Sequence, residues 1–177
     1  MYILVPLFTA LIAAGTFIRI PMVPVPITLQ TLFVFLSALL LTPSGAASSV
    51  ALYLILGAIG LPVFTSGGGL AAMLGPTGGF LISMLPAAFI GALIVKGNHK
   101  SMARSILALL LMEAVIYIIG VTWLKVQRSL TLSQALMGGF VPFIPGDIIK
   151  MAVAVVAAKY IYPEKEKLAE RRKAREE

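Results

Sequence analysis

Long apolar runs, separated by short polar or glycine- and proline-rich segments, make up most of this chain. A helix that crosses a bilayer needs about 20 mainly apolar residues, in a range of roughly 17 to 25. By that measure the pattern predicts an all-α membrane protein with six transmembrane helices. We expect them at about residues 2–20, 27–42, 45–61, 78–95, 103–124 and 145–162. Pro163 is expected to end the sixth, which divides the chain into a membrane domain, residues 1–162, and a charged tail, residues 163–177.

Two of the connections have an unusual composition. RIPMVPVPIT carries prolines at positions 21, 24 and 26, so it is expected to be extended and stiff rather than helical. PVFTSGGGLAAMLGPTGG is rich in glycine, and its apolar LAAML core is expected either to dip back toward the membrane or to cap a cavity. Backbone without helical hydrogen bonds is tolerated at membrane depth only where protein or water satisfies it.

Composition supports lipid as the main solvent of the chain. Hydrophobic residues make up 59% and charged residues 12%, with a mean hydropathy of +1.01. Soluble domains are about half apolar and about a quarter charged. No charged residue lies between Arg19 and Lys96. The net charge is +7, but many of the bases lie in the last nineteen residues, where they are interleaved with acids, and no nucleic-acid partner is expected. The chain has no cysteine, which excludes disulfides and thiolate metal sites.

The distribution of lysine and arginine predicts the orientation, because cytoplasmic loops carry an excess of both. With six crossings, the loops TPSG and KGNHKSMAR and the C-terminal tail share one side. Together with Lys159 near the end of the sixth helix, they hold ten of the 14 basic residues. Both termini are therefore expected in the cytoplasm. The proline-rich segment, the glycine-rich segment and PGDIIK would then share the outer side, which suggests a site there.

PGDIIK places an acid and a base at the start of the last apolar run. Asp147 and Lys150 are three residues apart and so share a helix face. Ionisable residues within a membrane segment mark functional sites by default. A carboxylate accepts N–H groups and an ammonium donates to oxygen, so the pair suits a ligand with both donors and acceptors. The alternative is a helix cap beside a snorkelling lysine, which together form a surface pair.

Polar residues in two other apolar segments are further candidates. Gln30 enters the second predicted helix and could bind a ligand or a neighbouring helix, while Thr28 could be the helix cap. Glu113 lies in the middle of the fifth, with Tyr117 one turn on. A carboxylate there usually faces the bundle interior. A protonated carboxyl group, a bond to Tyr117 and a bond to another helix all remain open, as do a structural role and a coupling role.

The glycine-rich segment ends in a second candidate site, Gly75, Pro76, Thr77 and Gly78. Glycine there could let the backbone approach a ligand closely, or the sequence could be a plain turn. The segment lacks the G-K-[ST] ending of a phosphate loop, so ATP hydrolysis by that route is excluded.

Small residues and a single histidine complete the candidates. Ala10 and Ala14 have the spacing that permits close helix packing, either within the chain or with a partner. His99, in a basic loop, is expected to be solvated. The predicted spans contain no Ser/His/Asp set, carboxylate pair or metal cluster.

Four segments occur in a characteristic order: PVPITLQTLFVFL, LYLILGAIGLPVF, GGGLAAMLGPTGGF and PGDIIK. In this series they closely resemble the biotin-specific substrate-binding (S) components of energy-coupling factor (ECF) transporters, over most of residues 10–160. The resemblance implies the six-helix S-component fold, with biotin held near the outer face. It also implies partners, namely a transmembrane coupling subunit and two ABC-type ATPases that use the ATP. No resident cofactor or metal is expected.

The resemblance also implies roles for particular residues. The Asp and Lys of the family's G-D-x-x-K motif contribute to the biotin site, and here they are Asp147 and Lys150. Roles in ligand binding follow for Gln30 and for the loop at residues 75–78. Small residues of the first helix contact the coupling subunit in this family, and Ala10 and Ala14 are the positions that fit.

We therefore expect a biotin-capture subunit in the cell membrane of a prokaryote, not an enzyme. Asp147 could accept the ureido N–H groups of biotin, and Lys150 could meet either the ureido carbonyl or the tail carboxylate. One alternative is a stand-alone, ion-coupled secondary transporter of a vitamin-like solute, for which Glu113 is the supporting feature. The other alternative, a membrane enzyme, would need a nucleophile and base pair that the spans lack.

Overall fold

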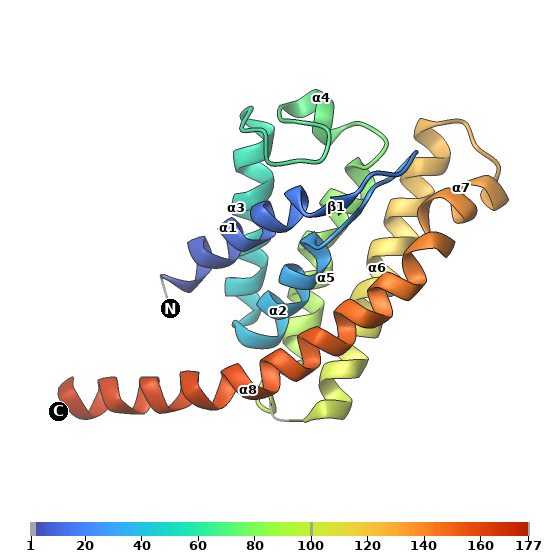
Figure 1. The fold of residues 1–177 in the computed structure, drawn as a ribbon. Helices are drawn as coiled ribbons and strands as arrows, with labels where there is room; N and C mark the ends of the chain where they lie inside the picture. The colour runs from blue at the N-terminus through green and yellow to red at the C-terminus, as the bar shows by residue number, and fades with distance from the viewer. Residues whose placement is uncertain (1–2, 100, 177) are drawn as a thin grey trace.

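The protein is mostly helical in a computed structural model (Figure 1). The model describes the backbone of residues 3–99 and 101–176 and the side chains of residues 3–99 and 101–162. The helices are α1 (Leu4–Phe17), α2 (Gln30–Leu40), α3 (Pro43–Ala58), α4 (Leu70–Met73), α5 (Gly78–Val95), α6 (Met102–Gln127), α7 (Leu132–Gly139), the 3-10 helix η1 (Val141–Phe143) and α8 (Ile144–Glu176). Two short strands, β1 (Arg19–Ile20) and β2 (Ile27–Thr28), pair in antiparallel fashion.

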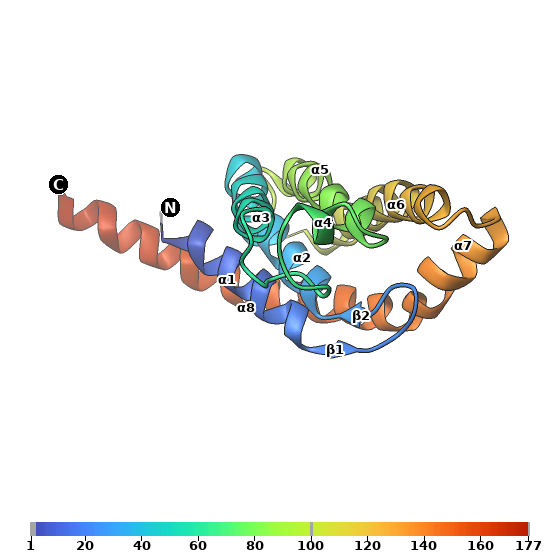
Figure 2. The same ribbon diagram turned by 90° about the horizontal axis from the view of Figure 1, so that it is seen from above.

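The long helices pack in two layers. From above, α3, α5 and α6 form one row, and α1, α2 and α8 lie in front of it (Figure 2). Within the layers α5 packs on both α3 and α6, and α2 packs on both α1 and α8. Across the layers α1 contacts α3, and α2 contacts α5. Apolar side chains from all of these helices form one continuous buried core.

Each of the six predicted apolar segments contains a helix, but the helices differ in length. α5 coincides with residues 78–95, and α6 begins one residue before and ends three residues after the predicted 103–124. In the described part of the chain, three stretches are long and apolar enough to cross a membrane: Gly78–Val95, Met102–Gln127 and Leu132–Tyr162. The others have 14, 11 and 16 residues in α1, α2 and α3. At about 1.5 Å per residue, α2 covers about half of a bilayer core.

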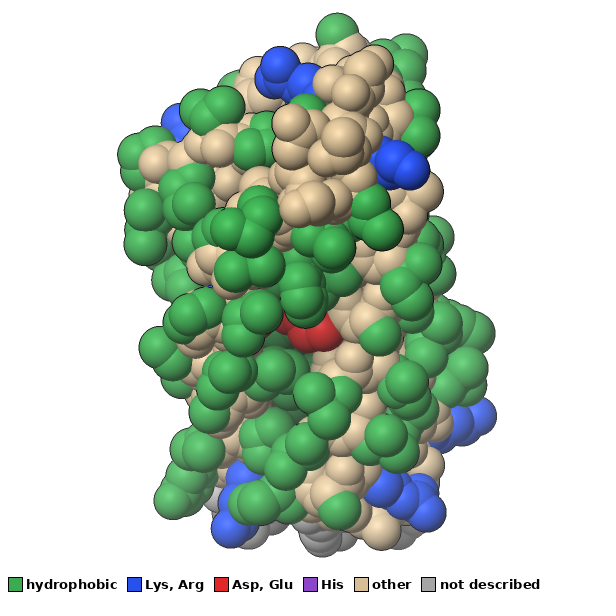
Figure 3. Space-filling view, turned by 90° about the vertical axis from the view of Figure 1, so that its right-hand side faces the viewer, with side chains coloured by type: hydrophobic (Ala, Val, Ile, Leu, Met, Phe, Trp, Pro, Cys, Tyr) green, Lys and Arg blue, Asp and Glu red, His purple; other side chains and the backbone are tan. Residues whose placement is uncertain are grey.

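The surface has the pattern of a protein surrounded by lipid. One side of the molecule is covered by hydrophobic side chains, with lysine and arginine gathered toward its two ends (Figure 3). Large apolar side chains of α6 and α8 are exposed, among them Leu110, Ile118, Ile149 and Val153. Such a belt would be a large aggregation-prone patch in water, but it is favourable against hydrocarbon.

The proline-rich connection is a hairpin rather than one stiff extended segment. Arg19 pairs with Thr28 and Ile20 with Ile27, so the chain turns back between them. The tip reaches α7, where a Cβ atom on Gly138 would lie 3.0 Å from Cδ of Pro24. The glycine-rich segment folds over the same end of the bundle and contains the single-turn helix α4 at its LAAML core (Figure 1).

One boundary prediction near the C-terminus is wrong, and one short helix was not predicted. α8 does not end at Pro163 but continues to Glu176. A proline removes one backbone hydrogen bond from a helix but does not always terminate it. α7 was not predicted because it is short; its N-terminus is fixed by a capping box between Thr131 and Gln134. The tail side chains lie outside the described residues, so the domain boundary at residue 162 stays a prediction.

His99 is not solvated as expected. Its ring is half-buried, with Nδ1 3.0 Å from the carbonyl oxygen of Leu39 at the end of α2. The same ring stacks on Tyr162 of α8, with the two ring centroids 4.5 Å apart. The loop between α5 and α6 is therefore attached to the layer that contains α2 and α8. Its basic composition is typical of a solvated loop and did not indicate this contact.

We predict that Gly120→Ala destabilises the fold. A Cβ atom at Gly120 of α6 would lie 2.3 Å from Cδ1 of Phe80 on α5, so the two helices or the ring must shift. Overpacking of this kind costs about 1–3 kcal/mol of unfolding free energy. Gly146→Ala is the matched control, because its Cβ would have its nearest neighbours at 3.9 Å. Thermal unfolding in detergent should show a lower midpoint for Gly120→Ala alone; equal midpoints for both variants would contradict the packing described here.

Candidate functional site

A small cavity lies between the two layers, near the end of the bundle that the hairpin covers. It has a volume of about 60 Å³ and is lined by residues of β2, α2, α5, α6, η1 and α8. Its apolar lining includes Val25, Phe80, Leu81, Met84, Ile116 and Phe143. Its polar lining includes Thr28, Gln30, Thr31, Glu113, Tyr117, Asp147 and Lys150. A mainly apolar wall with a few convergent polar groups is the usual form of a small-molecule site.

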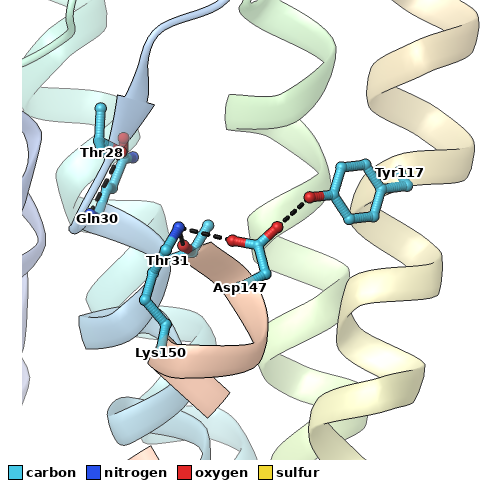
Figure 4. Close-up of polar contacts among 6 residues, drawn as sticks. All are labelled: Thr28, Gln30, Thr31, Tyr117, Asp147 and Lys150. Carbon is cyan, nitrogen blue, oxygen red and sulfur yellow. Dashed lines mark hydrogen bonds and ion pairs between the residues drawn. The ribbon is translucent and has the colours of Figure 1, made fainter. Parts of the chain in front are cut away.

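Asp147 and Lys150 form a buried ion pair, which excludes the alternative of a surface pair. Asp147 is 5% exposed and Lys150 6%, and the Lys150 Nζ atom lies 2.6 Å from Oδ1 of Asp147. Two other helices complete the arrangement (Figure 4). The Tyr117 hydroxyl of α6 donates to Oδ2 of Asp147, and Lys150 Nζ donates to Oγ1 of Thr31 on α2 at 2.9 Å.

The sequence around η1 explains how the pair reaches this depth. Pro142 and Pro145 lie in the first turns of η1 and α8. The N–H groups of a first turn have no acceptor within the helix, so proline, which lacks an N–H, is tolerated there. α8 begins beside the cavity, with Asp147 in its first turn on the face that is turned inward. The partial positive charge of the helix N-terminus favours an acid at that position. Lys150 follows one turn later on the same face.

The sequence did not predict that Thr31 and Tyr117 form hydrogen bonds with Lys150 and Asp147. Thr31 lies 119 residues before Lys150, and Tyr117 lies 30 residues before Asp147. Both carry hydroxyls in apolar segments, but their spacing along the chain gives no sign of these contacts. Only the packing of α2 and α6 on either side of α8 brings them together.

Gln30 lies at the predicted position, on the first turn of α2 and lining the cavity. The residue is 2% exposed, and its Nε2 atom lies 3.2 Å from Sδ of Met84 on α5. Thr28 Oγ1 accepts the backbone N–H of Gln30 at 3.3 Å, although Leu29 occupies the capping position itself. A role for Gln30 in ligand binding stays a prediction.

The loop at residues 75–78 is attached to α6 through Trp123. The indole Nε1 donates to the carbonyl of Gly75 at 2.9 Å. A Cβ on Gly78 would lie 3.3 Å from the same nitrogen and 2.1 Å from the carbonyl oxygen of Met73, so glycine is needed there for packing. Thr77 lines the cavity, whereas Gly75 and Pro76 line a wider groove outside it. The ligand-binding role of this loop, Gly78 included, stays a prediction.

The groove at the surface lies next to the cavity. Its volume is about 620 Å³, and Pro26, Thr65 and Thr77 line both spaces. The proline-rich hairpin forms one wall and the glycine-rich segment another, which confirms that these two segments and PGDIIK meet at one site. Arg19 and Arg128 are the charged residues of its lining in the described part of the chain. The guanidinium of Arg19 donates to the carbonyl of Thr65 across the groove.

Glu113 faces the cavity from the middle of α6. It is 7% exposed. The possible bond to Tyr117 is not formed, because the tyrosine hydroxyl donates to Asp147 instead. Oε1 of Glu113 is buried and has no hydrogen-bond partner among the residues that the structure describes.

Ala10 and Ala14 lie away from the cavity, on the exposed face of α1. The opposite face of the helix supplies Phe8 and Ile12 to the core. Packing within the chain therefore does not account for the two alanines. Contact with a partner protein stays a prediction.

Comparisons with known proteins agree on one family. Residues 1–167 match the BioY family. The probable biotin transporter BioY of Pyrococcus horikoshii is 43% identical over 157 residues, 88% of this chain and 92% of that protein. The biotin transporter BioY of Thermotoga maritima is 41% identical over 86% of this chain and 89% of that protein. The crystal structure of the S-component for biotin from an ECF-type ABC transporter matches with a TM-score of 0.81 at 33% identity, over 90% of this chain and 89% of that one.

We predict that Lys150→Met destabilises the ligand-free protein more than the double variant with Asp147→Asn. Removing the ammonium leaves the carboxylate buried without its counter-charge, which typically costs about 3–5 kcal/mol. Replacing both charges removes that penalty, so the two substitutions are not additive. Thermal unfolding of the wild type, both single variants and the double variant measures the coupling. Additive effects would mean that the pair is not coupled in the folded protein.

Proposed function

This chain belongs to the BioY family, and from that premise we propose that it is the biotin-capturing subunit of an ECF transporter. The relatives are named as biotin transporters and the matching structure is a transporter S-component, so the family is one of transport proteins and not of enzymes. The observation that carries the proposal is the buried Asp147–Lys150 pair, which lines a cavity beside a surface groove.

The two volumes support a particular orientation of biotin. Biotin has a ureido ring with two N–H donors and one carbonyl acceptor, a thioether ring and a valerate tail. A cavity of about 60 Å³ holds only a fragment of such a molecule, whereas the groove of about 620 Å³ has the size of a small-molecule site. We assign the ureido end to the cavity and the tail to the groove, where Arg19 and Arg128 favour a carboxylate.

This orientation assigns Lys150 to the ureido carbonyl rather than to the tail. An ammonium has three N–H donors, and Asp147 and Thr31 accept two of them. The third remains for the ligand. Gln30 and Thr77 line the same cavity, and Gly75 and Pro76 line the groove beside the tail.

The membrane arrangement and the partners complete the proposal. The chain crosses the cell membrane of a prokaryote six times, with both termini in the cytoplasm and biotin entering from outside. The three long apolar stretches and the three shorter apolar helices support this count, and the basic tail supports the orientation. A coupling subunit binds α1 at Ala10 and Ala14, and two ABC-type ATPases supply the energy. The chain itself has no phosphate loop.

We predict that the purified chain alone binds biotin and that Lys150→Met weakens this binding about 10- to 100-fold, because a hydrogen bond to a charged group is worth about 1.5–3 kcal/mol. Ser105→Ala is the control, since this buried residue lies at the other end of α6 and does not line the cavity. Calorimetric titration in detergent measures both. Absence of binding by folded wild-type protein would overturn the proposed substrate, and biotin uptake by vesicles that contain this chain alone would overturn the proposed partners.

We also predict that Arg128→Gln weakens the binding of biotin but not of biotin methyl ester. An exposed ion pair contributes about 0.2–1 kcal/mol, so the effect on biotin is at most about fivefold and declines with added salt. Lys125→Gln is the matched control, because Lys125 is an exposed base of the same helix end and does not line the groove. An equal loss for the acid and the ester would place the tail elsewhere.

A further inference from the structure

Glu113 is the one buried carboxyl group of the cavity whose hydrogen bonding is incomplete in the described structure. Its Oε1 atom is the only buried side-chain oxygen or nitrogen without a partner in the described part of the chain. The side chain projects from α6 into the space that Asp147 and Lys150 reach from α8. Nothing in the comparisons assigns it a role.

The neighbouring polar groups are already paired with one another. Oδ1 of Asp147 accepts from Lys150 and Oδ2 accepts from Tyr117, so each carboxylate oxygen holds one strong bond (Figure 4). The Tyr117 hydroxyl donates its single proton to that bond. Among the described residues, one N–H of Lys150 has no acceptor and the Oε1 atom of Glu113 accepts no bond, whereas each oxygen of Asp147 already accepts one strong bond. Oε1 of Glu113 is therefore the better acceptor for a ligand N–H.

A purely structural role for Glu113 does not fit this arrangement. Burying a polar atom without a partner is unfavourable, and buried polar atoms are normally satisfied. Tyr117 stands one helical turn away and could have supplied the bond, yet it points to Asp147. The residues around Glu113 in the sequence ALLLMEAVI are apolar, so an apolar side chain would suit a packing role.

We propose that Glu113 accepts a ureido N–H of biotin and so determines the specificity of the site for that ring. This rests on the proposed function. Lys150 donates to the ureido carbonyl while Glu113 accepts from the N–H beside it. Asp147 acts through its neighbours, holding Lys150 and Tyr117 in position, and is not the main acceptor of the ligand.

The test combines variants of the protein with variants of the ligand. Affinities are measured for biotin and for two analogues, each methylated at one of the two ureido nitrogens. Glu113→Met removes the acceptor at similar size, and Glu113→Gln retains an uncharged acceptor. We expect Glu113→Met to bind biotin about 10- to 100-fold more weakly than wild type, with Glu113→Gln between them.

The methylated analogues separate a direct contact from a general disturbance. In the wild type, the analogue that lacks the N–H facing Glu113 should bind more weakly than biotin. Glu113→Met should abolish most of that difference, because the acceptor is gone. Asp147→Asn should weaken all three ligands by the same factor, because it acts through Lys150. Ser105→Ala should change none of these ratios.

Two outcomes would overturn the inference while leaving the proposed function intact. One is unchanged biotin affinity in Glu113→Met, with the wild type still binding. The other is loss of discrimination in Asp147→Asn but not in Glu113→Met, which would make Asp147 the acceptor. If Glu113→Met fails to fold, Glu113→Gln decides. Its weaker, uncharged acceptor should reduce the difference between biotin and the methylated analogue if the contact is direct, whereas a packing defect would weaken all three ligands by the same factor. Failure of the wild type itself to bind biotin would instead refute the proposed function.

Discussion

The burial of one ion pair in an apolar bundle is the constraint on which the arrangement of this protein depends. Asp147 and Lys150 carry opposite charges and are almost completely shielded from bulk water, so each depends on partners within the protein. Those partners are Thr31 on α2 and Tyr117 on α6. The first turn of α8 is thereby fixed against both layers of helices at once. A small shift of α2, α6 or α8 would break one of these hydrogen bonds and leave a buried polar group without its partner. The geometry of the site therefore depends on how the three helices pack.

Close packing elsewhere holds that scaffold in register. Gly79 and Gly120 let α5 and α6 approach until Trp123 and Phe80 fill the space that a Cβ would occupy. Phe80 then stands edge-on to Tyr117, whose ring also meets Phe140 at the end of α7. The same Trp123 holds the glycine-rich loop through Gly75. The hydroxyl that meets Asp147 is therefore positioned by aromatic contacts, which restrict a ring more firmly than a flexible aliphatic side chain would.

The features that the sequence predicted are those that depend on short stretches of residues, such as apolar runs and isolated charges. Hydropathy located α5 and α6 closely because an unbroken run of about 20 apolar residues matches the thickness of a bilayer core. The cost of an intramembrane charge pointed to Asp147 and Lys150 without any knowledge of the fold. Thr31 and Tyr117 were beyond such reasoning, since their contacts arise from the packing of distant segments. Two predictions failed because a local signal was misleading. α8 continues past Pro163, although proline usually ends a helix. His99 contacts α2 and α8, although the composition of its loop is typical of solvated segments.

Two polar groups of the cavity, one N–H and one oxygen, have no partner among the residues that the structure describes and lie on different helices, and this placement relates the helix packing to ligand binding. α8 packs extensively on α2 but touches α6 much less, and near the cavity the link between α6 and α8 includes the bond from Tyr117 to Asp147. The free N–H of Lys150 belongs to α8, and the free oxygen of Glu113 belongs to α6. A planar ring that presents a carbonyl and an adjacent N–H can satisfy both groups together only by bridging these two helices. Such a ligand would add a second polar link between two helices that make few direct contacts, so its binding energy would depend on how closely α6 and α8 approach. A ligand can shift a conformational equilibrium only through interactions that differ between the states. The separation of α6 and α8 is therefore the structural variable through which occupancy of this cavity would reach the rest of the protein.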